Sequence, residues 1–198
     1  SVKSRGLGDV YKRQDINIHE LGCDFFTGAI HKWLCGPKGS SFLYVKKSHQ
    51  NWVKPIIYSW GKNGDDPGPS EFLQDFQWQG TRDMSSFLTI PKAIDFFLEY
   101  IQPNQAHCRK IILEAFSQFQ SILGTNAISL GSDWIGQMVS HPLPKDTPTD
   151  LKEILWNKHK IEIPIFEWNG DFYIRSSFQV YNEKKDLDSL MSVLGSIF

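Results

Sequence analysis

The sequence predicts an α/β chain that ends in a small α+β unit, and three observations carry this prediction. Two short apolar runs, 23–27 and 41–45, have the composition of buried strands. Apolar residues then recur with a helical period between residues 85 and 123. Near the end, Asn169-Gly170 separates two strand-like runs. With 198 residues, 40% of them hydrophobic, the chain can bury a sizeable core.

The first residues do not fit this pattern. Residues 1–14 (SVKSRGLGDVYKRQ) combine glycines and scattered charges without a helical or strand period. We interpret them as a cloning or sequence-assembly artefact and exclude them from the fold prediction.

The first strand pair encloses the most informative segment. Between Cys23–Thr27 and Ser41–Val45 lie the pair His31-Lys32 and the turn Gly36-Pro37-Lys38-Gly39. An unpaired ammonium costs several kcal/mol to bury, so Lys32 is poorly placed here if it is only a charge. A lysine that forms a Schiff base with a carbonyl cofactor tolerates such surroundings. The alternative is a lysine that reaches from a strand end to solvent.

The middle of the chain is predicted as a long loop followed by helices. Residues 49–80 are rich in Trp, Gly and Pro, and 63–69 form a loop. A helix should follow over 85–101, with Pro91 kinking it or marking a late start. A second helix should cover 105–123 and end at Gly124.

The C-terminal part is predicted as a small α+β unit. In order, we expect a strand over 134–139, a loop over 142–148, a helix over 150–159 capped by Thr149 or Asp150, a hairpin of 163–168 and 171–176 with a type I′ turn, and a helix over 185–197.

Composition argues against several classes of partner. A formal net charge of -1 with mixed signs gives no footprint for nucleic acid or an anionic membrane. No apolar run approaches the roughly 18 residues of a membrane helix. Cys23, Cys35 and Cys108 have no disulfide framework spacing, so we expect reduced thiols and a cytoplasmic protein. Cys23, His31 and Cys35 match no metal motif, and we predict no metal site.

The segment Thr27-Gly28-Ala29-Ile30-His31-Lys32-Trp33-Leu34, followed by Gly36-Pro37-Lys38-Gly39-Ser40, resembles the cofactor-lysine segment of class V aminotransferases. Its nearest match is the isopenicillin N epimerase-like branch. The resemblance implies that Lys32 carries pyridoxal 5'-phosphate and that His31 lies by the cofactor phosphate. Cysteine desulfurases of the same superfamily have a hydroxyl residue where this chain has Ala29.

The resemblance also assigns roles further along the chain. It implies that Gly80 and Thr81 reach the cofactor phosphate of the neighbouring subunit, which makes the protein a homodimer with a shared active site. Free N–H groups at a helix start could bind that phosphate, although an ordinary helix start explains the same residues. It also places the arginine for the substrate carboxylate at Arg175, where a surface charge is the alternative.

The resemblance runs from residue 16 to the end and covers the C-terminal half of the family fold. It implies that 15–100 is the C-terminal part of the large cofactor-binding domain of a pyridoxal-phosphate-dependent transferase fold, and that 101–198 is the small C-terminal α+β domain. The expected activity is chemistry at Cα of an amino-acid substrate, as epimerase, aminotransferase or C–S lyase, and we expect this fragment alone to be inactive. The alternative is an inert, truncated or degenerate relative. Desulfurase chemistry is disfavoured because residues 131–149 contain no cysteine.

Overall fold

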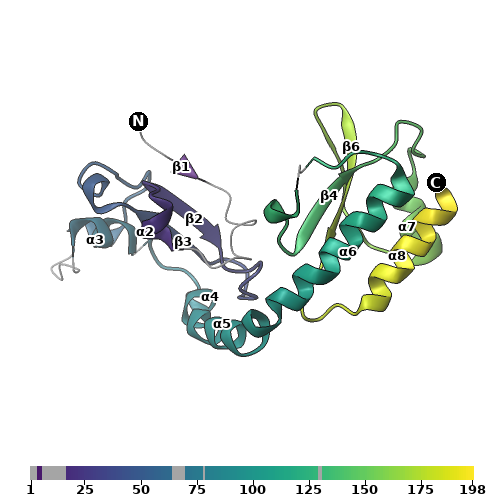
Figure 1. The fold of residues 1–198 in the computed structure, drawn as a ribbon. Coiled ribbons are helices and arrows are strands. Elements are labelled where there is room, and N and C mark those ends of the chain that lie inside the picture. Colours follow the sequence, from purple (N-terminus) through teal and green to yellow (C-terminus); the bar gives the residue numbers. More distant parts are fainter. Residues whose placement is uncertain (1–3, 6–16, 64–69, 78, 129–130) are drawn as a thin grey trace. The chain divides into compact units, whose positions relative to one another are not determined.

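The structure is a computed structural model that describes residues 4–5, 17–63, 70–77, 79–128 and 131–198. Its chain divides into two compact units, 1–95 and 96–198 (Figure 1). The assignment of 15–100 and 101–198 to two domains of a larger fold stays a prediction. Most of the segment 1–14 and of the predicted loop 63–69 lies outside the described residues.

The sheet of the first unit has the order β1-β2-β3. β2 (Phe25–Ala29) pairs antiparallel with β3 (Ser41–Val45), and Thr27 lies opposite Leu43. The second strand has the predicted bounds. The first begins and ends two residues later than predicted, because its bounds follow the pairing with β3, which runs from Phe25 to Ala29 and includes Gly28 and Ala29, two poor strand formers.

The sequence suggested that both strands are buried, but neither strand is buried on both faces. Phe26 and Gly28 are buried, whereas Thr27 between them is exposed and its hydroxyl donates to the carbonyl oxygen of Phe42 at 2.8 Å. Ser4 and Arg5 form the short strand β1, parallel to β2. This part of the segment that we excluded therefore takes part in the sheet.

The first unit also contains short helical segments. They are α2 (Ile18–Leu21), the 3-10 helices η1 (Lys47–His49) and η2 (Trp60–Asn63), α3 (Glu71–Gln77), α4 (Ser85–Leu88) and α5 (Ile90–Phe96). The long loop predicted over 49–80 was wrong at α3, where the rings of Phe72 and Phe76, one helical turn apart, pack in a tilted arrangement with centroids separated by 4.7 Å. The helix predicted over 85–101 breaks at Thr89, before Pro91, which matches the predicted effect of that proline.

The second unit begins with a continuous helical stretch. The π-helix η3 (Phe97–Ile101) and the 3-10 helix η4 (Gln102–Asn104) lead into α6 (Gln105–Leu123). The bounds of α6 are those predicted from the sequence. Gly124 ends the helix in the left-handed conformation, with φ of 61°, and donates its N–H to the carbonyl oxygen of Gln120.

The sheet of the second unit has the order β4-β6-β5 and is antiparallel throughout. β5 (Ile165–Trp168) and β6 (Asp171–Ser177) form the predicted hairpin. Asn169 and Gly170 have φ of 54° and 82°, as a type I′ turn requires. The strand predicted over 134–139 was misplaced. Residues 132–134 form the 3-10 helix η5 (Ser132–Trp134), and β4 covers Met138–Pro142, where it can pair with β6.

Helices α6, α7 (Leu151–His159) and α8 (Lys184–Ile197) complete the second unit, and α6 packs against both α8 and β4 (Figure 1). The predicted helices over 150–159 and 185–197 are confirmed to within one residue. Asp150 occupies the N-cap position, but its side chain makes no capping hydrogen bond. The core includes six fully buried residues, Ile112, Ala115, Phe119, Leu155, Ile174 and Leu194.

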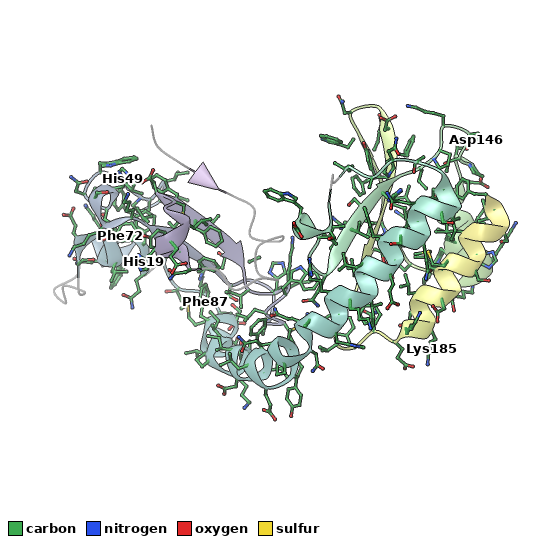
Figure 2. The ribbon with its side chains drawn as sticks, viewed as in Figure 1. His19, His49, Phe72, Phe87, Asp146 and Lys185 are labelled. Atoms are coloured by element: carbon green, nitrogen blue, oxygen red, sulfur yellow. The ribbon has the colours of Figure 1, made fainter. Side chains whose placement is uncertain are left out.

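The side chains labelled in Figure 2 help to locate the two units in the picture. His19, His49, Phe72 and Phe87 lie in the first unit, whereas Asp146 and Lys185 lie in the second, in the β4–α7 connection and at the start of α8 (Figure 2). Among the described residues, no helix combines the length and apolar character needed to cross a membrane.

Candidate active site

Lys32 lies in a tight turn directly after β2. The turn is closed by main-chain hydrogen bonds: the N–H of Gly36 donates to the carbonyl oxygen of Ile30, and that of Cys35 donates to the carbonyl oxygen of Lys32, both at 3.1 Å. The N–H of Ile30 donates to the carbonyl oxygen of Ser40, also at 3.1 Å. The lysine is therefore carried on a turn that is fixed to both strands.

His31 and Lys32 are both exposed in this turn. The expectation that Lys32 is enclosed by apolar surroundings was therefore wrong for the described chain. Lys32 is thus an exposed residue at the end of the strand pair, and its role as cofactor lysine stays a prediction.

Gly80 and Thr81 lie before α4 rather than at its start. Gly80 has φ of 104°, a conformation that favours glycine, and residues 82–84 separate Thr81 from the helix. The side chain of Asp83 accepts hydrogen bonds from the Ser85 N–H, at 2.8 Å, and from the Ser85 hydroxyl. These bonds lower the pKa of Asp83, the hydroxyl contributing most.

Thr81 is therefore not a helix cap, and the prediction of a helix start at Gly80-Thr81 was wrong. The N-cap position of α4 belongs to Met84, which makes no side-chain capping hydrogen bond. Arg82 lies over the ring of Phe87, with its guanidinium carbon 4.6 Å from the ring centroid. The cofactor-phosphate role of Gly80 and Thr81 stays a prediction that rests on the family resemblance alone.

Arg175 lies on β6, opposite Ser140 of β4. Its main-chain N–H donates to the carbonyl oxygen of Pro164 at 3.0 Å. The side chain is half-buried, its guanidinium carbon is 5.8 Å from the ring centroid of Phe166, and its Nε atom is buried without a hydrogen-bond partner among the described residues. A buried donor without a partner is costly, so this atom is a candidate contact for an anionic ligand.

Arg175 also lines a cavity of about 460 Å³ within the second unit. The cavity lies between residues 159–164, the end of β6 and the start of α8, and Asn182 and Asp186 add polar groups to its wall. A rigid strand therefore presents the arginine to a space of the size that binds small molecules.

Sequence reasoning missed the polar residue that fixes the end of β6. The Nε2 of Gln137 donates to the carbonyl oxygen of Phe178 at 2.9 Å, and the Phe178 N–H donates to the carbonyl oxygen of Gln137 at 3.0 Å. The only signal was a glutamine inside a predicted strand.

The predicted site residues divide between the units: His31, Lys32, Gly80 and Thr81 lie in the first, and Arg175 lies in the second.

Comparison of this sequence with known proteins identifies the family to which the chain belongs. The sequence pattern of "Aminotransferase class-V" matches residues 9–190, and so includes residues 9–14 of the segment that we interpret as an artefact. The chain is 26% identical to isopenicillin N epimerase from Amycolatopsis lactamdurans, over 91% of this chain and 48% of that protein. It is also 26% identical to a probable chloroplastic L-cysteine desulfhydrase from Arabidopsis thaliana, over 98% and 43%.

Solved structures agree on the fold. The cysteine desulfurase CsdA of Escherichia coli superposes with a TM-score of 0.76 at 16% identity, covering 97% of this chain and 50% of that one. C-DES, in a structure with glycine covalently linked to its PLP cofactor, also superposes with a TM-score of 0.76, at 13% identity. The chain thus matches enzymes of PLP-dependent fold type I and spans about half their length. Because the family pattern covers most of its residues, the chain belongs to the aminotransferase class-V family, whose members use pyridoxal phosphate.

Proposed function

We propose that this chain is the lysine-bearing part of a pyridoxal-phosphate-dependent enzyme that acts at Cα of an amino-acid substrate. The observation that carries the proposal is the Lys32 turn. Lys32 is an exposed residue, and main-chain hydrogen bonds fix the turn at the ends of β2 and β3. A reactive amine on a rigid element is what covalent attachment of a cofactor requires.

The residues present are compatible with this cofactor. Lys32 would hold it covalently, and the neighbouring imidazole of His31 would lie by its phosphate. Pyridoxal phosphate, when bound, supplies an electron sink for charge that develops at the substrate Cα. In the proposed reaction, the amine of Lys32 takes and returns the Cα proton.

Arg175 is proposed to bind the substrate carboxylate. Its guanidinium presents a planar set of donors that matches a carboxylate, and its buried Nε has no partner among the described residues. The strand that carries Arg175 is paired on both sides, which would hold the substrate in one orientation.

The reaction that follows proton removal is proposed only as a class. Epimerisation, transamination and C–S lysis all begin by breaking a bond at Cα, and the relatives described above include an epimerase and a probable cysteine desulfhydrase. Desulfurase chemistry through a cysteine nucleophile is disfavoured, because residues 131–149 contain no cysteine and Cys23 and Cys108 are buried. The free state of all three cysteines supports a cytoplasmic location.

We also propose a homodimer, in which Gly80 and Thr81 reach the neighbouring cofactor phosphate. Its support is a segment of the first unit that carries exposed apolar side chains. Ile56, Ile57 and Trp60 are 102%, 80% and 88% exposed. Large apolar side chains that are exposed and close in sequence are typical of an interaction surface.

A catalytically inert relative is the alternative, and it differs in what Lys32 does. We expect pyridoxal phosphate to give the visible absorbance change of covalent attachment with the unaltered chain. Lys32→Arg should abolish that change, whereas Lys47→Arg, at an exposed lysine of η1, should retain it. An equal response from both variants would favour the inert alternative.

Arg175→Lys separates substrate binding from cofactor binding. The variant keeps the positive charge but loses the planar fork. We expect unchanged attachment of pyridoxal phosphate and weaker binding of amino acids, measured by titrating the loaded protein with a panel of L-amino acids. Equal affinity in the variant would contradict the role of Arg175.

A further inference from the structure

The turn that carries Lys32 closes through one pair of residues, Ile30 and Gly36. The Gly36 N–H donates to the carbonyl oxygen of Ile30, and the Ile30 N–H donates in turn to the carbonyl oxygen of Ser40, both at 3.1 Å. Residues 31–35 therefore form a loop whose flanking residues, Ile30 and Gly36, are joined by a main-chain hydrogen bond.

The closure leaves no room for a side chain at position 36. A Cβ atom added to Gly36 would lie 2.6 Å from Cγ2 of Ile30 and 3.4 Å from its carbonyl oxygen. The requirement for glycine is therefore steric and comes from close approach of the chain. At Gly39 the left-handed conformation, with φ of 103°, imposes the requirement instead.

Ile30 has little freedom to move aside. Its side chain is buried at 5% exposure, and a β-branched residue has few rotamers at χ1. Both its N–H and its carbonyl group are used in the hydrogen bonds that close the turn. A side chain at position 36 must therefore shift the turn itself, and Lys32 with it.

We propose that Gly36 is a positioning residue for Lys32. By lacking a side chain, it lets the turn close against Ile30 and so sets the direction in which the amine leaves the end of β2. The inference rests on the proposed function, in which that amine is the reacting group.

The test compares four forms of the 198-residue chain. Each is mixed with pyridoxal phosphate and reduced with borohydride, and the label on Lys32 is measured by mass spectrometry relative to that on Lys47. The variants are Gly36→Ala, Gly36→Ala with Ile30→Leu, and Gly195→Ala. Leucine keeps the volume of isoleucine but removes the β-branch that meets position 36. Gly195 is the control, because a Cβ atom added there would meet nothing within 4 Å in α8.

The expected result has three parts. Gly36→Ala lowers the Lys32:Lys47 ratio by about tenfold, since small displacements of a reacting group have large effects. Adding Ile30→Leu restores the ratio, and Gly195→Ala leaves it unchanged. Thermal unfolding, followed in the same samples, separates displacement of the turn from loss of the fold.

Two different failures are distinguishable. If the unaltered chain labels Lys32 no better than Lys47, the proposed function fails and the inference fails with it. If the unaltered chain prefers Lys32 and Gly36→Ala keeps that preference, only the positioning role is overturned. Should Gly36→Ala not fold, the double variant decides: recovery of folding and labelling supports the contact with Ile30, and no recovery overturns it.

Discussion

His141 lies fully buried in the second unit, with Nε2 3.1 Å from the carbonyl oxygen of Thr125. Because a carbonyl oxygen only accepts, Nε2 carries the proton of the neutral ring. Nδ1 has no partner among the described residues, and the ring stacks on Phe119 with centroids 5.9 Å apart. The site therefore accommodates a neutral imidazole and disfavours an imidazolium.

Mild acid should destabilise the second unit through this histidine. Burial lowers the pKa of His141 below its ordinary 6.5, an effect that the hydrogen bond to Thr125 opposes. Between the two pKa values the unfolded chain binds more protons, so the free energy of unfolding falls as pH falls. The contribution is fully present above the ordinary pKa and is lost below it, by at most about 1.4 kcal/mol per pH unit.

His141→Phe should remove this dependence, and urea unfolding between about pH 7 and about pH 5 measures it. The matched control is His107→Gln, since His107 is exposed on α6 of the same unit. A pH slope that His141→Phe leaves as steep as in the unaltered chain would assign the acid sensitivity to other groups.

Asp75 should stabilise the first unit more than its neighbour Glu71 does. The Asp75 side chain is 2% exposed and lies 3.4 Å from Lys54 Nζ and 3.6 Å from Lys62 Nζ, joining α3 to η2. Asp75→Asn should cost about 1–3 kcal/mol, because it leaves a buried polar group with weaker partners.

Glu71→Gln is the comparison, because Glu71 also contacts Lys54 but is 72% exposed. Its substitution should have a smaller effect that added salt reduces further. Chemical denaturation of both variants measures the difference. Equal losses would mean that burial of Asp75 does not determine its contribution.

Substitutions at the two positions of the Asn169-Gly170 turn should differ in their effect on stability. Gly170→Ala places a Cβ at φ of 82° and should destabilise the second unit by about 1–2 kcal/mol. Asn169→Gly should be nearly neutral, because glycine adopts the φ of 54° there without strain. Thermal unfolding compares them, and a neutral Gly170→Ala would argue against the type I′ geometry.

The proposed homodimer should depend on the exposed apolar segment of the first unit. Ile57→Glu should weaken self-association, since it places a charge in a surface that must be dehydrated. Sedimentation velocity over a range of protein concentrations measures this. Leu88→Glu, at an exposed leucine of α4, is the control; equal effects of the two substitutions would not support the segment as the interface.

Local signals in the sequence predicted local structure well. Gly124 ended α6 and Asn169-Gly170 formed the turn because both depend on backbone conformations that few residues adopt. β4 was misplaced because its position depends on pairing with β6, which no local pattern encodes. α3 was missed because the Gly- and Pro-rich residues before it suggested a loop that continues.

The candidate site likewise has features that local sequence signals predicted and features that depend on the folded structure. The position of Lys32 after a strand followed from the apolar run and the turn residues, whereas its exposure depends on how Trp33 and Leu34 pack. The steric requirement at Gly36 could not be predicted, because it depends on the placement of the Ile30 side chain. Arg175 could be assigned to a strand, but its unpartnered Nε is a property of the folded unit, as far as the described residues extend.

The assignment of Lys32 as the cofactor lysine is tested most directly by trapping the attachment site. The chain is mixed with pyridoxal phosphate, reduced with borohydride, digested, and mapped by mass spectrometry. We predict that the pyridoxyl group is confined to the peptide containing Lys32. Label spread over exposed lysines such as Lys38 and Lys47, with Lys32 no higher than the rest, would contradict the account.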